Sequence, residues 1–183
     1  MILTTYTGKS FDLENYEDFE FDVTDFAHGL SNLCRYAGQC ASFYSVAQHS
    51  VLVSLIVPEK HAKEALLHDA TEAFVADLPS YVKKQLPDYV EIEDKLAECI
   101  FKKFGLKYPM HSSVKKADTQ ALVTEFRDLF PSKNLAKMEK IYGVKAGEGF
   151  PEGFSIDCLP PNHAKQFFLQ RYNELFNKKV NYK

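Results

Sequence analysis

The chain has 183 residues, of which 45% are hydrophobic and 26% charged, a composition typical of a globular protein and not of a fibrous or disordered one. Its formal net charge of −3 excludes a general attraction to nucleic acid or anionic membranes, so an anionic ligand would need a local cluster of cations. No apolar run approaches the roughly 20 residues of a membrane-spanning helix, and no signal peptide is recognisable. The four cysteines lack the spacing of a metal site or a disulfide framework. Together these features predict a soluble cytoplasmic protein with reduced thiols.

Residues 1–22 predict a small β-hairpin, because two short β segments flank a Thr-Gly-Lys turn. Beyond it, apolar side chains recur at helical spacing. The predicted helices span residues 24–35, 46–56, 59–75, 88–104 and 111–130, with a last helix beginning after Asn162. Residues 131–161 hold many of the glycines and prolines and predict a loop with one short helix inside it. We therefore expect one mostly α-helical domain over residues 1–183.

Several of these helices carry signals at their ends. Thr24 or Asp25 can cap the first helix, which would then run through Arg35. Ser45 can cap the second helix, and Gly105 is a natural stop for the fourth. These signals set the predicted bounds of three helices.

The segment EALLHDATEAFVADLPSYVKK, residues 64–84, gathers titratable side chains. His68 and Asp69 are adjacent, and Glu72 follows one turn later. On a helix these three side chains lie within about 100° of one another and opposite an apolar arc. Taken alone, this arrangement favours an ordinary solvated face.

Two other helices direct polar side chains toward the predicted core. His49 lies within an apolar stripe of its helix, where a lone histidine is more often a satisfied core residue than a ligand. Asp118 shares its helix face with Val114 and Leu122, and an ionised carboxylate buried without a partner is strongly unfavourable. Its partner could be a core-facing Arg or Lys, or a metal ion.

One divalent metal ion would account for these positions together. His49 and His68 would supply two imidazole nitrogens, while Asp69 and Asp118 would supply two carboxylate oxygens. Mixed nitrogen and oxygen ligation suits Mn, Fe, Co, Ni or Zn and leaves positions for water and substrate. The residues thus predict one metal site shared by three helices.

The pattern of one histidine, a His-Asp pair and a later aspartate resembles the HD superfamily of metal-dependent phosphohydrolases. The segments CRYAGQCASFYSVAQHS, EALLHDATEAFVADLPSYVKK and VKKADTQALVTEFRDLF are similar to its branch of bacterial 5′-deoxynucleotidases and of prophage and phage deoxynucleotide phosphohydrolases, including dATP triphosphohydrolases. A bare His-Asp dipeptide is weak evidence, whereas the whole spaced set is specific. The resemblance implies an HD-type helical bundle.

The resemblance also implies roles for the acidic residues. It assigns His49, His68, Asp69 and Asp118 as ligands of a metal ion that activates water and polarises the scissile phosphate. Glu72 is expected to act as general base or general acid, with Asp77 as its helper. The structural alternative for Asp77 is an acid that caps the turn before Leu-Pro.

For the substrate, the resemblance points to Arg35, Tyr36 and Lys83, and the sequence adds Lys115. Arg35 would bind phosphate in a bidentate manner from a helix face shared with His28 and Asn32, while each lysine could equally be a solvated surface residue. Tyr36 stands where the nucleotidases typically have Trp, which leaves the base preference open.

Other side chains have weaker expectations attached to them. Phe43 and Tyr44 are alternative aromatic shelves for the base. Glu125, on the same stripe as Asp118, is expected to pair with a buried Arg.

The expected activity is hydrolysis of a phosphate ester on a 2′-deoxynucleotide, with two outcomes left open. A monophosphatase would release phosphate. A triphosphohydrolase would release triphosphate, would take its substrate with Mg²⁺, and would need more cations. Those cations could be Lys83, Lys84, Lys115 and Lys116. Hydrolysis of a signalling nucleotide and non-catalytic sensing of a nucleotide are the alternatives, although the presence of Glu72 argues against a sensor.

The resemblance also bears on partners and origin. The expected partner is a small deoxynucleotide, with neither nucleic acid nor membrane involved. Relatives in the HD superfamily form dimers or larger rings, so self-association is expected by analogy. The setting would be the bacterial cytosol, with a bacterial, prophage or phage gene.

Overall fold

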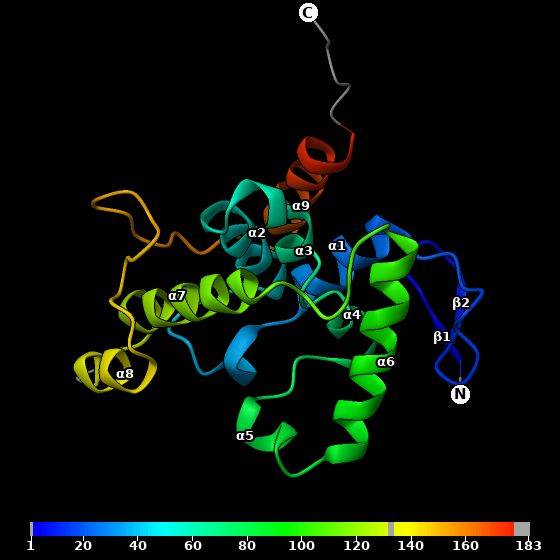
Figure 1. Ribbon diagram of the computed structural model, residues 1–183, viewed down its shortest axis with the longest axis horizontal. Coiled ribbons are helices and arrows are strands. Elements are labelled where there is room, and N and C mark those ends of the chain that lie inside the picture. The colour runs from blue at the N-terminus through cyan, green and yellow to red at the C-terminus, as the bar shows by residue number, and fades with distance from the viewer. Residues whose placement is uncertain (1, 132–133, 178–183) are drawn as a thin grey trace, which may run out of the picture.

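The computed structural model describes residues 2–131 and 134–177 and is mostly α-helical, as predicted (Figure 1). Two strands, β1 (Ile2–Thr4) and β2 (Ser10–Asp12), form an antiparallel hairpin in which Leu3 pairs with Phe11. The helices that follow are α1 (Val23–Asn32), α2 (Val46–Ile56), α3 (Ala62–Leu66), α4 (Glu72–Val75), α5 (Ser80–Lys83), α6 (Pro87–Lys103), α7 (Ser112–Leu129), α8 (Leu135–Tyr142) and α9 (Pro161–Phe176). Short 3₁₀ turns lie at Arg35–Gly38 (η1) and Glu59–His61 (η2).

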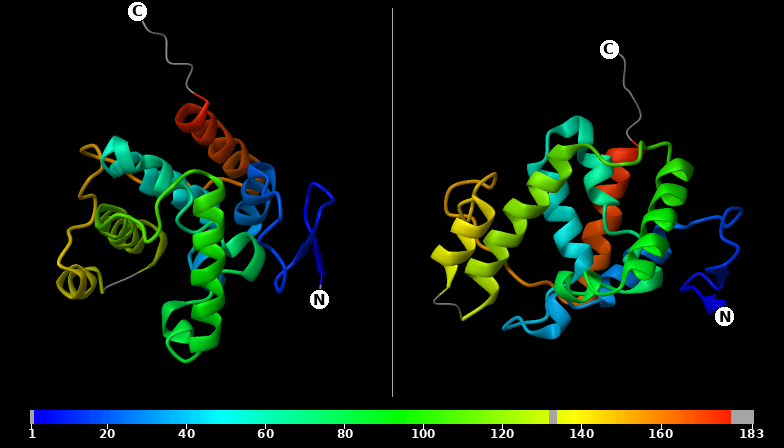
Figure 2. Two further views of the ribbon diagram at one scale, coloured as in Figure 1. Left: turned by 45° about the vertical axis from the view of Figure 1, so that its right-hand side comes forward. Right: turned by 60° about the horizontal axis from the view of Figure 1, so that its bottom comes forward.

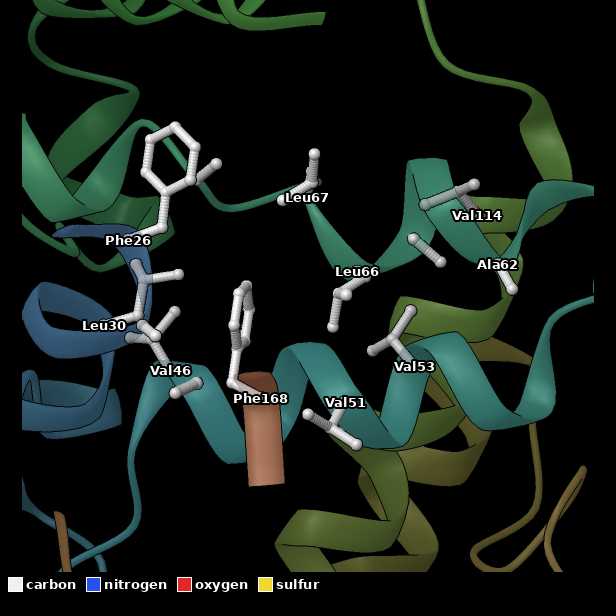
Figure 3. Close-up of a cluster of buried hydrophobic side chains, with 14 of the residues drawn as sticks. Phe26, Leu30, Val46, Val51, Val53, Ala62, Leu66, Leu67, Val114 and Phe168 are labelled. Atoms are coloured by element: carbon white, nitrogen blue, oxygen red, sulfur yellow. The ribbon is translucent and has the colours of Figure 1, made fainter. Parts of the chain in front are cut away.

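Helix α2 lies at the centre of the core. Every residue from Val46 to Ser54 is buried, because α2 packs against α1, α3, α7 and α9. Figure 3 shows Val51 and Val53 of α2 facing the same interior as Leu66 of α3 and Phe168 of α9. A residue of α2 that carries a polar group is therefore placed inside the molecule and needs a partner there.

The outer elements frame this core. The hairpin and α8 lie at opposite ends of the molecule in all three views, with α8 beside α7 (Figures 1 and 2). Phe11 of β2 anchors the hairpin, since its ring lies 4.5 Å from that of Phe74 in α4. Helix α5 and the first half of α6 project from the body on the side that also holds η1 (Figure 1).

The predicted helix ends are partly confirmed. Ser45 caps α2 by accepting a hydrogen bond from the Gln48 backbone N–H at 3.2 Å, and α6 ends just before Gly105, whose φ is +67°. The expected cap of the first helix was wrong. Asp22 caps α1, while the Asp25 carboxylate accepts from the Thr7 backbone N–H at 2.7 Å.

The single helix predicted over residues 59–75 was also wrong. The chain forms η2 and α3, turns over residues 67–71, and resumes as α4. His68 Nδ1 lies 2.7 Å from the Ala65 carbonyl oxygen and takes the acceptor that a continuing helix would offer to the Asp69 N–H. This turn, and not helical spacing, therefore sets the positions of His68 and Asp69.

The second half of the chain follows the prediction closely. Helix α7 covers the expected segment, α8 is the short helix within the predicted loop, and α9 begins at Pro161, slightly earlier than expected. Residues 132–133, which fall in that loop, lie outside the described part. Among the described residues, every helix is too short or too polar to cross a bilayer.

Candidate metal centre and active site

Three segments far apart in sequence bring their side chains to one point. His49 comes from the first turn of α2, His68 from the turn after α3, and Asp118 from α7. One ligand atom from each of these residues lies within 4.8 Å of the other two, so the group could hold a metal ion. His49 is fully buried, as its apolar stripe predicted, and the side chains of His68 and Asp118 are 6% and 18% exposed.

Both imidazoles present the same nitrogen to this point. His49 Nδ1 donates to Glu125 Oε1 at 2.6 Å, and His68 Nδ1 donates to the Ala65 carbonyl oxygen at 2.7 Å. In a neutral imidazole this leaves the lone pair on Nε2. Nε2 of both residues is buried and makes no hydrogen bond, which is the state expected of ligand nitrogens.

Carboxylates surround these two nitrogens. His49 Nε2 lies 3.3 Å from Asp118 Oδ1 and 3.7 Å from Asp69 Oδ2, without hydrogen-bond geometry, and Asp69 Oδ2 lies 3.2 Å from His68 Nε2. Burial and Arg35 lower the pKa of His49, but Glu125 and Asp118 outweigh them and raise it to about 9. The site therefore favours a positive charge at Nε2, which a proton or a metal ion can supply.

Glu125 of α7 forms a buried hub behind the metal-binding group. Besides His49, its carboxylate accepts hydrogen bonds from the hydroxyls of Tyr36 and Tyr44, the latter at 2.9 Å, and lies 3.2 Å from Arg35 Nη2. Burial raises the pKa of Glu125, but Arg35 and His49 lower it to about 2. The ionised carboxylate thus fixes both the ring of His49 and the guanidinium of Arg35.

A cavity of about 570 Å³ opens next to the metal-binding group, a volume ordinary for a small-molecule site. Its polar lining consists mainly of Arg35, Asp69, Glu72, Asp77, Lys83, Lys115 and Asp118, and its apolar wall of Tyr36, Leu122, Phe126, Phe130, Met138 and Tyr142. A second hollow of about 310 Å³ reaches His68 and Asp118 from another side. A third, of about 540 Å³ near Tyr16 and α6, holds none of these polar residues.

Two of the acids that line the cavity, Glu72 and Asp77, have raised pKa values. Burial, and then the charges of Asp69 and Asp77, raise the pKa of Glu72 well above its usual range. Its Oε2 is buried and without a hydrogen-bond partner, while Oε1 lies 3.5 Å from Lys83 Nζ. Burial also raises the pKa of Asp77. Raised pKa values in a cavity make these two carboxyls candidates for proton transfer.

Two stretches beside the cavity have an unusual backbone. Tyr36 and Ala37 in η1 have φ of +58° and +51°, and Ala76 has φ +72° with ψ 158°. The last combination is nearly restricted to glycine and costs about 1–3 kcal/mol. It lies immediately before Asp77, so strain is stored where a candidate active-site residue is positioned.

Most residues singled out from the sequence line this cavity or the metal-binding group. Asp69 lies against that group, with its Oδ2 also 3.6 Å from Arg35 Nη1. Arg35, Tyr36, Lys83 and Lys115 all face the cavity. The charged groups are already paired, since Lys83 Nζ lies 2.7 Å from Glu93 Oε1 and Lys115 Nζ lies 2.7 Å from Asp118 Oδ2.

Some of the expectations were wrong. Arg35 does not share a helix face with His28, because α1 ends at Asn32 and His28 stacks on Tyr6 at 3.8 Å. Tyr44 is fully buried under Glu125, and Phe43 does not line the cavity, so neither forms its wall.

Three further expectations about charge and exposure changed. Lys84 and Lys116 do not line the cavity, and Lys116 lies 3.9 Å from Glu148. His68 and Asp69 do not form a solvated face. The partner of Asp118 is the exposed Lys115, not a core-facing cation, whereas the buried pair between Glu125 and an arginine is confirmed.

Sequence reasoning missed the support of the site. Tyr89 and Glu93 of α6, one turn apart, contact the carbonyl of Ala76 and the ammonium of Lys83. Their spacing of four residues was the available signal, but it indicates a shared face and not what that face meets. The apolar wall from α7 and α8 was missed as well, because the sequence shows which side chains share a helix face but not what that face meets.

Fold and site together define a mostly α-helical protein with a candidate metal centre of two histidines and an aspartate. The chain is 41% identical over 173 residues to the uncharacterized protein YfdR of Escherichia coli strain K12, covering 94% of each chain. It is 30% identical over 183 aligned positions to an uncharacterized protein of Rhodobacter capsulatus, covering 92% of each. The chain therefore belongs to the family of YfdR. No family model matches it.

Proposed function

We propose that this chain is a metal-dependent phosphohydrolase of the HD type that hydrolyses a phosphate ester of a 2′-deoxynucleotide. The observation that carries the proposal is the pair of buried, unpartnered Nε2 atoms of His49 and His68, aimed at carboxylates beside a cavity that contains arginine and lysine. The similarity of three segments to deoxynucleotidases supports the substrate class.

His49, His68 and Asp118, with Asp69 against them, would hold the ion, and this donor set fits a divalent transition metal such as Mn, Fe, Co, Ni or Zn. Such an ion would supply Lewis acidity toward a phosphoryl oxygen and would activate water. Arg35, already fixed by Glu125, presents a rigid fork toward the phosphate. Lys115 and Lys83 add positive charge to the same cavity.

Glu72 is the proposed proton-exchanging residue. Glu72 lines the cavity, its Oε2 is buried without a hydrogen-bond partner, and its raised pKa keeps a proton available for the leaving oxygen. Asp77 lines the same cavity and would assist in orienting water or in proton transfer. Lys83 holds Glu72 from the side of α6.

The charge of the cavity favours a monophosphate over a triphosphate. Three cationic and four carboxylate side chains line it; with Glu72 protonated and a divalent ion bound, the formal sum is about +2. That charge balances one phosphate group but not the roughly fourfold negative charge of a triphosphate. We therefore place deoxynucleoside 5′-monophosphatase activity first and triphosphohydrolase activity second.

A panel of deoxynucleoside and ribonucleoside mono- and triphosphates, assayed under Mn²⁺, Co²⁺, Ni²⁺, Zn²⁺, Fe²⁺ and Mg²⁺, tests this proposal. We expect inorganic phosphate from the deoxynucleoside monophosphates, with a transition metal more effective than Mg²⁺. Release of triphosphate from dATP would instead identify a triphosphohydrolase. If nucleotide binds to the metal-loaded protein but no product forms over hours, the chain is a sensor and the proposal is wrong.

Two variants separate metal binding from proton transfer. His68→Ala should lose both the metal and turnover, because it removes one ligand. Glu72→Gln should keep the metal yet lower kcat by about 10²–10⁴, the usual contribution of general acid–base catalysis. Full activity of Glu72→Gln would contradict the assigned role.

A further inference from the structure

Ala76 connects the two acids of the cavity through a strained backbone. It follows α4, which begins with Glu72, and it precedes Asp77. Its φ of +72° and ψ of 158° fall in a region that alanine rarely adopts, and its side chain gains nothing obvious from this, since it is exposed. Something other than local preference must hold this conformation.

Hydrogen bonds hold Ala76 from both sides. Its N–H donates to the Glu72 carbonyl oxygen at 2.9 Å, closing the last turn of α4. Its carbonyl oxygen accepts from the Tyr89 hydroxyl at 2.7 Å, and the same hydroxyl lies 3.2 Å from the Val75 carbonyl oxygen. Tyr89 belongs to α6, so a separate element clamps the peptide that leads into Asp77.

We propose that Tyr89 is a positioning residue that holds Asp77 in the cavity by clamping the strained Ala76 peptide. This inference rests on the proposed function only for its effect on turnover. Without the hydroxyl, the peptide between Ala76 and Asp77 is free to rotate into an ordinary region, and the Asp77 backbone turns with it.

The surroundings of Tyr89 suit this role. Burial, and then the charge of Glu93, raise the pKa of Tyr89 to about 12, so its hydroxyl stays a donor at neutral pH. Glu93, one turn later on α6, holds Lys83, which in turn lies 3.5 Å from Glu72. One face of α6 therefore supports both acids, Asp77 through Tyr89 and Glu72 through Lys83.

If the clamp holds a strained peptide, the effect of Tyr89→Phe on stability depends on the residue at position 76. Glycine adopts this φ and ψ without strain, so Ala76→Gly should raise Tm by about 2–6 °C and keep the geometry. In the alanine protein, Tyr89→Phe loses a hydrogen bond but releases strain, so Tm changes little. In the Ala76→Gly protein no strain is released, so Tyr89→Phe should lower Tm more than it does in the protein with Ala76.

The test is a double-mutant cycle of Tyr89→Phe and Ala76→Gly in the full-length, Mn²⁺-loaded protein with dAMP as substrate. Tyr89→Phe should lower kcat about 10–100-fold with a much smaller change in KM, the scale expected for misplacing an active-site group. Adding Ala76→Gly should restore kcat to within about threefold of the Ala76→Gly protein. Tyr172→Phe, in α9 and outside the residues that line either hollow beside the metal-binding group, is the control and should leave kcat unchanged.

The cycle can fail independently of the proposed function. If the protein hydrolyses dAMP but Tyr89→Phe keeps full kcat, or if Ala76→Gly does not rescue it, Tyr89 has no positioning role. If no variant turns over any nucleotide, the Tm cycle and crystal structures still decide the question. A Tyr89→Phe structure with Ala76 and Asp77 unmoved would overturn the inference.

Discussion

Glu125 sets the chemistry of the residues around it, because one buried carboxylate serves four partners. It orients His49 through Nδ1, pairs with Arg35, and accepts from two tyrosine hydroxyls. The sequence predicted the pairing with a buried arginine from the position of Glu125 on the stripe of α7. It could not predict the contact with His49, since no pattern within α7 indicates which helix packs against it.

Replacing Glu125 with Gln keeps the shape and removes the charge. At pH 7 we expect the variant to lose about 3–5 kcal/mol of unfolding free energy, because buried Arg35 keeps only the partly exposed Asp69, 3.6 Å away, as a counter-charge. The pKa of Glu125 is lowered to about 2 in the folded protein, so its stabilisation is present above the unfolded value near 4.5 and is lost as the pH falls toward 2.

Urea unfolding at pH 7 and at successively lower pH measures this difference. The difference in unfolding free energy between the native protein and Glu125→Gln should decrease as the pH approaches 3. Glu148→Gln is the matched control, since Glu148 is exposed and lies 3.9 Å from Lys116, and it should change stability by less than about 1 kcal/mol. A gap that widens in acid would contradict the assignment.

At the scale of elements, the close packing of α1 on α4 places Glu72. Gly29 of α1 leaves room for Ala73 of α4, because a Cβ at position 29 would lie 3.0 Å from the Ala73 Cβ and 3.2 Å from its Cα. Both neighbouring atoms belong to backbone or to a short rigid side chain, so the helix itself would have to move. The sequence contains this glycine but not its partner, which only the packing of α4 provides.

Gly29→Ala should therefore displace α4 despite the better helix propensity of alanine. We expect a loss of about 1–2 kcal/mol in unfolding free energy, because the cost of overpacking exceeds the gain in helix propensity. Turnover should also fall, because Glu72 shifts with α4. Thermal unfolding and kcat measure the two effects. Ala73→Gly in the same chain should restore turnover by making space; failure of this rescue would show that the α1–α4 contact does not set the position of Glu72.

At the scale of the molecule, the candidate metal centre ties α2, the turn after α3, and α7 together around a central buried helix. A ligand that binds only this assembled arrangement stabilises the fold by mass action. The self-association implied by the resemblance stays a prediction.

Adding Mn²⁺ or Co²⁺ at about 100 times its Kd should raise the stability by about 2.7 kcal/mol and Tm by about 5–10 °C. Calorimetry with and without a chelator measures the shift. His68→Ala should abolish it, whereas His163→Ala, which removes an exposed histidine of α9, should retain it. An equal shift in both variants would mean that the ion binds elsewhere.

The sequence alone determined those features that depend on neighbours a few residues away. Alternation and a Gly turn predicted the hairpin, Ser45 set the start of α2, and helical periodicity predicted that His49 is buried. Such signals act within one or two turns, where backbone hydrogen bonds and side-chain spacing are fixed by local geometry.

Only the tertiary structure decided how these side chains meet. The partners of Glu125 lie between 76 and 90 residues away along the chain. The strain at Ala76 persists because a tyrosine from another helix satisfies its carbonyl. Burial removes water as an alternative partner, so the packing of distant helices, and not the local sequence, selects each contact.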